Sequence, residues 1–219
     1  MLHRSPSLGV AGSELTRLLA RFAGTPLVDT RPAFAERLCH WLKWTDAASL
    51  SAALSASPAA SAPGRARGAD AEDADFRCVR TTLEASIAAG PREPASNPTD
   101  FGPHRRHCIS QQQAMQEAVG ALRQRLRDAL SRRSPQGARL AAIDAVMDKA
   151  LTTHERNLLG LVPLRLQTHF DQLQRTAGDD AHWPKTFLQD MNRVLRAELA
   201  HRLLPAQGLL DTLRKHPPT

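Results

Sequence analysis

The fold is decided by residues 115–158, which read MQEAVGALRQRLRDALSRRSPQGARLAAIDAVMDKALTTHERNL. On both sides of Ser134, apolar side chains recur every three or four residues, as in a helix with one buried face. This pattern predicts one helix from about His107 to Arg133 and a second that Ser134 caps and Pro135 starts. So short a connection makes the two helices antiparallel. The apolar positions are Met115, Val119, Leu122, Leu126 and Leu130, then Leu140, Ile143, Met147, Leu151 and Leu158.

The predicted hairpin has a definite register. Residues whose numbers sum to about 268 face each other, because both helices rise by about 1.5 Å per residue. Leu122 then lies opposite Met147, so that apolar side chains meet apolar side chains. The same register places Arg123 near Asp144 and Asp148, and we expect salt bridges there, as on the flanks of a coiled coil.

The composition favours a protein made of α-helices. The chain has 219 residues, of which 42% are hydrophobic and only 4% aromatic, and it contains no tyrosine. The β-branched and aromatic residues that suit strands are scarce, whereas alanine, leucine, arginine and glutamine dominate. This argues against an all-β protein and against a wholly disordered chain. We expect an all-α fold: a long antiparallel helical hairpin or bundle with a small N-terminal helical unit.

The sequence divides into four parts. Residues 1–54 contain three short helical patterns, which predict an N-terminal helical unit. Residues 55–69 combine small residues with proline and glycine and have little to bury, so we expect a flexible linker. Residues 70–103 contain a helix and a proline-rich loop, and residues 104–219 form the antiparallel bundle.

Two prolines divide the predicted helices of the bundle. Pro163 interrupts the second helix of the hairpin, because proline removes a backbone hydrogen bond and clashes with the preceding turn. A final long helix is expected to begin at Trp183 and to end before Pro205. The segment from Gln207 to Lys215 then forms one more short helix.

Arginine carries most of the positive charge. The formal net charge is +7, and 25 arginines accompany only four lysines. Residues 105–133 hold seven arginines and two acids, and such a segment can follow the phosphates of a nucleic acid. The alternatives are a solvated or salt-bridged helix pair and a GC-rich coding sequence; no aromatic side chains for base stacking lie between the arginines. The candidate anion or nucleic-acid surface is Arg105, Arg106, Arg123, Arg127, Arg132 and Arg133.

Histidine and cysteine side chains offer a possible metal site. His104, His107 and Cys108 have a spacing that can bring ligands to one zinc ion, and Cys39 and His40 supply a second pair. A structural zinc site needs four ligands at paired spacings, and linker-like segments separate these two groups. We therefore expect no bound metal and no cofactor.

An acidic stripe is the other candidate for chemistry. Asp144, Asp148 and Glu155 can share one side of a helix, and paired carboxylates can bind a divalent metal or transfer protons. Because the stripe faces arginines, we expect solvated salt bridges instead. His154 stands where the helical pattern expects an apolar residue, so we interpret it as a packing residue at the edge of the seam.

Two tryptophans lie three residues apart in the N-terminal unit. Trp41 and Trp44 are candidate anchors for a partner protein, because tryptophan is enriched among the residues that dominate binding energies. Packing between the first helices is the alternative interpretation.

The sequence favours a cytoplasmic protein. Residues 1–12 are not followed by the apolar run of a secretory signal. The longest apolar stretch, residues 158–164, is too short to cross a membrane. The three cysteines form no closely spaced pair, as is usual in a reducing compartment.

Five strings of the sequence are Leu15 to Arg21, Leu38 to Leu54 with its Trp-Leu-Lys-Trp-Thr-Asp core, Gln112 to Asp148, Phe187 to Met191, and Leu195 to Leu213. Together they resemble an uncharacterised proteobacterial family that is catalogued only as a domain of unknown function. The resemblance spans nearly the whole chain, with residues 55–75 and 90–103 as its variable parts. It implies a helical bacterial protein and offers no catalytic residues to transfer. It also keeps association with an envelope protein in view.

The motifs of common enzyme classes are absent from the sequence. It has no Gly-x-Gly-x-x-Gly, no phosphate-binding loop, no Gly-x-Ser-x-Gly and no His-Glu-x-x-His. We therefore expect a non-enzymatic protein that acts through helix–helix contact with a protein partner or a second copy. The alternative is a nucleic-acid-associated protein that uses the arginine-rich helix.

Overall fold

The regular structure is entirely helical in the part of the chain that the computed structural model describes, residues 13–22, 44–55, 68–92, 97, 99–178 and 182–215. The expected all-α bundle is therefore confirmed. The helices are α1 (Glu14–Phe22), α3 (Trp44–Ser55), α4 (Ala69–Ala88), α5 (Gly102–Ser131), α6 (Pro135–Leu159), α7 (Val162–Thr176) and α8 (Trp183–Lys215).

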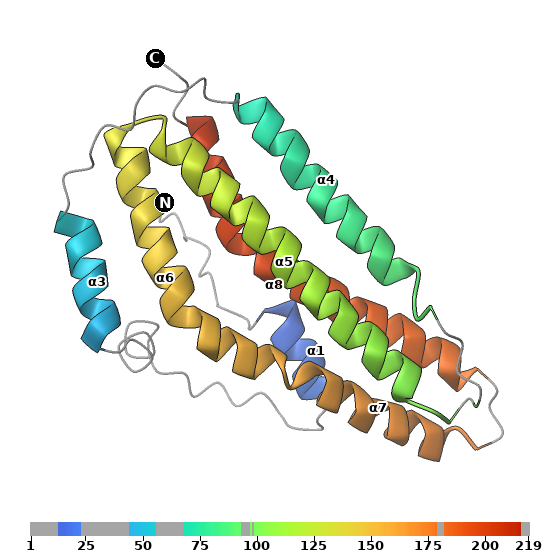
Figure 1. Ribbon diagram of the computed structural model, residues 1–219. Helices are drawn as coiled ribbons and strands as arrows, with labels where there is room; N and C mark the ends of the chain where they lie inside the picture. Colours follow the sequence, from blue (N-terminus) through green and yellow to red (C-terminus); the bar gives the residue numbers. More distant parts are fainter. Residues whose placement is uncertain are drawn as a thin grey trace, which may run out of the picture.

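Helices α5 and α6 form the predicted antiparallel hairpin (Figure 1). The side chain of Ser134 caps α6, because its Oγ accepts a hydrogen bond from the backbone N–H of Gly137 at 3.0 Å. A Cβ atom on Gly137 would lie 2.3 Å from the carbonyl oxygen of Leu130, so this tight turn requires glycine. Helix α5 begins at Gly102, earlier than predicted, because Pro103 fits the first helical turn.

Four columns of helix make up the bundle: α4, α5, α8 and the consecutive pair α6–α7 (Figure 1). Helix α4 packs along both α5 and α8 and runs antiparallel to them. Near its start Asp73 pairs with Arg214 at the end of α8, and near its other end Ser86 accepts a hydrogen bond from Gln111 of α5. Helices α5 and α8 lie side by side and run in the same direction.

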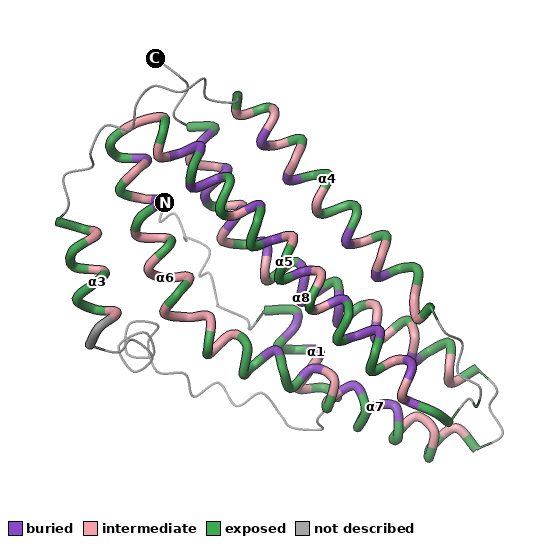
Figure 2. Tube along the Cα trace, viewed as in Figure 1, coloured by how far each residue is buried: buried purple, intermediate pink, exposed green. Residues whose placement is uncertain are grey.

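The core lies between these columns. Buried side chains follow the inner faces of α4, α5 and α8, whereas α3 lies outside α6 and is largely exposed (Figure 2). The fully buried residues that fill the centre include Ile87 of α4, Met115, Leu122 and Leu126 of α5, Leu166 of α7, and Phe187, Met191, Leu195 and Leu210 of α8.

The prediction that the last long helix ends before Pro205 is wrong. Helix α8 continues through Pro205 to Lys215, so the segment from Gln207 belongs to the same helix. A proline inside a helix costs about 3 kcal/mol. The next two turns bury Leu209, Leu210 and Leu213 in the core. Each buried leucine contributes about 1.5–3 kcal/mol, so their burial outweighs the lost hydrogen bond.

The two described helices of the N-terminal segment pack on different parts of the bundle. Helix α1 buries Leu15, Leu18 and Phe22 against α7 and α8, whereas α3 packs on α6. Ser13 caps α1, since its Oγ accepts a hydrogen bond from the backbone N–H of Thr16. Residues 23–43 of the expected N-terminal helical unit and residues 56–67 of the expected linker lie outside the described residues.

The packing predicts unequal costs for two leucine truncations. Leu122 has no exposed surface, so Leu122→Ala should lower the free energy of unfolding by about 2–5 kcal/mol. Leu54 on α3 is 52% exposed, and Leu54→Ala should cost less than about 0.5 kcal/mol. Urea titrations followed by circular dichroism measure both values. Equal losses would show that Leu122 does not belong to the closed core.

Candidate functional site

The predicted salt bridges across the α5–α6 hairpin are present. Arg123 donates to Asp144 through Nε at 2.8 Å and Nη2 at 2.7 Å, and to Asp148 through Nη1 at 2.7 Å. Arg127, one turn further along α5, donates to the same two carboxylates. Both pairs of residues are four apart in the sequence, so each pair lies on one side of its helix. The four side chains form a closed network on the flank of the hairpin.

This hairpin network is partly shielded from water. The side chains of Arg123 and Arg127 are only 13% and 11% exposed. Burial raises the pKa of Asp144, but hydrogen bonds and the charges of the two arginines outweigh burial, so its pKa is lowered. Both guanidinium groups therefore already hold carboxylates and are not available to phosphate.

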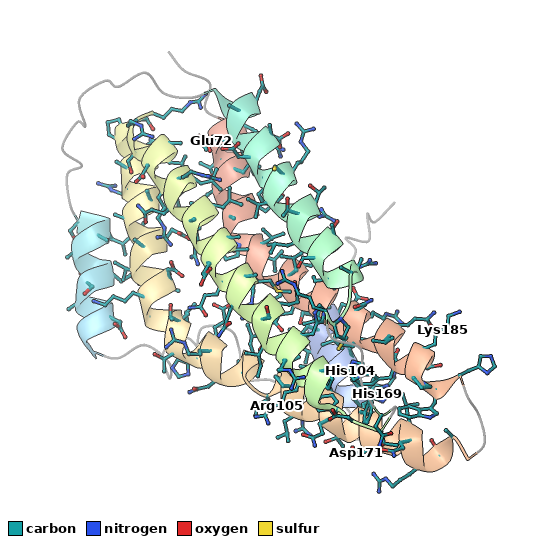
Figure 3. The ribbon with its side chains drawn as sticks, turned by 45° about the vertical axis from the view of Figure 1, so that its right-hand side comes forward. Glu72, His104, Arg105, His169, Asp171 and Lys185 are labelled. Carbon is teal, nitrogen blue, oxygen red and sulfur yellow. The ribbon has the colours of Figure 1, made fainter. Side chains whose placement is uncertain are left out.

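The remaining arginines of the candidate anion surface lie far apart. Arg105 and Arg106 are in the first turns of α5, whereas Arg132 and Arg133 follow its last residue. About 27 residues separate the two pairs, which is roughly 40 Å along a helix. Figure 3 shows Arg105 at the same end of the bundle as Lys185. The structure thus does not gather the six arginines into one surface.

The N-terminal candidates lie largely outside the described residues. This is so for Trp41, a candidate partner anchor, and for Cys39 and His40, the second pair of candidate metal ligands. Trp44 is the first residue of α3, but its side chain is also outside the described part.

Two histidines proposed as metal ligands lie instead in an apolar end of the bundle. The ring of His104 packs among Phe101, Phe170 and Phe187, with ring centroids 5.1 to 6.3 Å apart. Figure 3 shows His104 and His169 close together at this end. His107 is buried on α5, and burial lowers the pKa of both His104 and His107. Burial also raises the pKa of the Cys108 thiol to about 12, which makes it unreactive. Among the described residues, no three histidine, cysteine or acidic side chains are grouped as metal ligands.

A second polar network, which the sequence analysis missed, stands where α6 gives way to α7. Pro163 has no N–H, so the carbonyl of Leu159 four residues earlier loses its helical partner. Gln112 of α5 supplies the replacement, because its Nε2 donates to the Leu159 oxygen at 2.9 Å. The same amide nitrogen lies 2.9 Å from Oε2 of Glu198 on α8. The one signal in the sequence was Pro163, which predicts an unpaired carbonyl but not its new partner.

Glu198 is the most deeply buried charged residue of this network. Its side chain is completely buried, and burial raises its pKa, while Arg202 and Gln112 oppose that effect. Arg202 donates to Glu198 at 2.9 Å and also lies 3.6 Å from Glu155 of α6. The network ties α5, α6 and α8 together beside the helix break.

An apolar groove opens next to this network, between α1, α6 and α8. Its volume is about 660 Å³, within the usual range for binding sites. Leu15 and Leu19 of α1, Met147 and Leu151 of α6, and Pro205 of α8 contribute to its lining. Leu158, Leu161 and Leu204 also line it and are 59%, 45% and 63% exposed.

The polar side chains of the groove are largely engaged. Asp148 pairs with Arg123 and Arg127, and Glu155 lies beside Arg202. His154, interpreted from the sequence as a packing residue at the seam, is half-buried in the groove. The groove therefore exposes leucine side chains, and the two acidic residues of its lining are held in ion pairs.

Residues 1–215 match a family described as "Protein of unknown function (DUF3348)". The chain belongs to this family. The resemblance to a domain of unknown function is thereby confirmed, and the family description assigns no activity. No curated protein and no solved structure matches the chain. None of the described helices combines the length and apolar character needed to cross a membrane.

The hairpin network predicts a large effect for one carboxylate. Asp144→Asn should lower the free energy of unfolding by about 3 kcal/mol, since it leaves two poorly exposed arginines with a single carboxylate. Asp211→Asn is the matched control, because Asp211 pairs with Arg214 at the surface, and it should cost less than about 1 kcal/mol. Urea titrations at pH 7 measure both. A cost for Asp144→Asn no larger than the control would contradict a stabilising network.

The pKa of His104 predicts a pH effect on stability. Because folding lowers this pKa, the unfolded chain binds more protons just below the usual histidine value of about 6.5, and stability falls as the pH drops through that range. His104→Phe suits the surrounding phenylalanines and removes the titrating group. The variant should therefore lose less stability than the wild type between pH 7.5 and pH 5.5, as measured by urea titration. An equal loss of stability in the variant and the wild type would show that His104 does not contribute to the pH effect.

Proposed function

We propose that the protein is a non-enzymatic interaction protein that binds an amphipathic helix in the groove between α1, α6 and α8. The observation that carries this proposal is the gathering of exposed leucines there. Leu158, Leu161 and Leu204 are all about half exposed and line one groove. Single exposed leucines are normal on protein surfaces, but a contiguous cluster marks a binding surface.

The shape and chemistry of the groove suit the binding of a helix better than the catalysis of a reaction. A bound amphipathic helix inserts apolar side chains spaced three and four residues apart into such a groove. The described carboxylates of the lining, Asp148 and Glu155, are held by arginines, so they are poorly placed to transfer protons. Binding of nucleic acid receives less support, because Arg123 and Arg127 hold carboxylates and the other candidate arginines lie at opposite ends of α5.

A photo-crosslinker tests this function in cells that express the protein. Benzoylphenylalanine replaces Leu158 in one variant and Leu54, an exposed leucine on α3, in the control. Irradiation should cross-link position 158 to the apolar side of a helix, identified by mass spectrometry, and should give no such product at position 54. No adduct at position 158, or the same adducts at both positions, would refute the proposed function.

A further inference from the structure

The groove between α1, α6 and α8 is lined by one arginine, Arg165, that has no acidic partner in the described part of the chain. Arg165 is the fourth residue of α7 and is half-buried. No described carboxylate lies within salt-bridge distance of its guanidinium group, and the first turn of α7 contains no acidic residue. A charge that is partly removed from water without a partner is unfavourable. Arg165 is therefore a site where a carboxylate from outside these residues would be stabilised.

The two acidic residues of the lining do not neutralise Arg165. Asp148 accepts a hydrogen bond from Arg123 at 2.7 Å, and Glu155 lies 3.6 Å from Arg202. Three arginines and two acids line the groove, so its lining has one positive charge in excess. The excess charge falls on Arg165, because the other two arginines already hold carboxylates.

The residues beside the lining make the groove more positive. His154 and His201 belong to the lining and can add only positive charge. The acid Glu14, next in sequence to a lining residue, lies 3.7 Å from Arg193. A negatively charged ligand is therefore attracted to the groove and a positively charged one is repelled. The other charged residues next in sequence to the lining are all basic: Arg17, Arg21, Lys149 and Arg156.

The lining follows α6 and reaches Arg165 at one end. Met147, Leu151, Leu158 and Leu161 recur at helical spacing along this wall. The wall from Met147 to Leu161 is about 21 Å long, because a helix rises by about 1.5 Å per residue. That length matches about four turns of a bound helix. Arg165 lies roughly one turn beyond Leu161, so its charge marks one end of the groove.

We propose that the groove receives an acidic amphipathic helix of a partner protein, with a carboxylate near one end of that helix paired with Arg165. The inference rests on the proposed function, because it names the charge and the direction of the helix that the groove binds. Arginine can hold a carboxylate through two parallel hydrogen bonds, and such charged pairs are stronger than neutral hydrogen bonds. The apolar side chains of the partner fill the groove, and the ion pair sets which end of the partner lies over α7.

A display library of amphipathic helical peptides tests the charge that the groove selects. The peptides carry leucines alternately three and four residues apart, and their polar positions are randomised. Selection on the full chain should enrich aspartate or glutamate at a polar position near one end of the peptide. Selection on Arg165→Glu should replace that acid with lysine or arginine. The control Arg196→Glu changes an exposed arginine outside the groove and should select the same acidic peptides as the wild type.

The affinity of one selected peptide measures the ion pair itself. Changing its acid to glutamine should raise the dissociation constant at least about tenfold on the wild type and less than about twofold on Arg165→Gln. Circular dichroism should show unchanged helical content and melting temperature for Arg165→Gln, because Arg165 has no described partner to lose. An equal effect of the peptide change on both proteins would overturn the inference.

The same selection separates the inference from the proposed function. Selected helices without a preference for acids, whose binding is still lost in Leu158→Asp, would overturn the inference and leave the proposed function standing. A library that yields no helix dependent on Leu158 would refute both.

Discussion

Pro163 carries no N–H group, so the carbonyl of Leu159 cannot be satisfied within its own helix. An unpaired buried carbonyl is costly, and α6 ends at Leu159 itself. Gln112 restores the missing hydrogen bond from the neighbouring helix α5. The break in the column α6–α7 is therefore built into the packing of the bundle, and the neighbouring network and groove both depend on it.

The buried carboxylate of Glu198 limits how the helices can slide past one another. A buried charge is unfavourable unless it is paired and hydrogen bonded. Glu198 meets that condition only where Gln112 of α5 and Arg202 of its own helix are both within reach. A shift of α8 by one turn would strand the carboxylate in the core. The same residues thus fix the alignment of α5 with α8 and support the helix break.

The sequence allowed the hairpin and its salt bridges to be predicted, but it misplaced the buried face of α6. Leu158, expected on that face, is 59% exposed, whereas Gly137, Ala141 and Leu159 are the buried residues of this helix. The helical repeat is constant and the turn at Ser134 is short, so the positions of Arg123 and Asp144 follow from counting. Contacts between distant segments could not be predicted in this way. Gln112 and Glu198 are 86 residues apart, and nothing local links them. The path of α8 through Pro205 likewise depends on burial of leucines against other helices, which outweighs a local rule.

The leucines at the junction are exposed because the helix breaks there. Where α6 ends, Leu158 and Leu161 turn toward the groove, while Leu159 and Val162, which follow them directly in the sequence, are buried in the core. Polar residues at the outward positions would cost the folded chain little, because these side chains bury little apolar surface within it. The same junction is held from inside by Gln112, so its leucines are presented on a fixed backbone. A surface that is already ordered loses less entropy on binding, which makes this junction better suited to receive a helix than a mobile hinge would be.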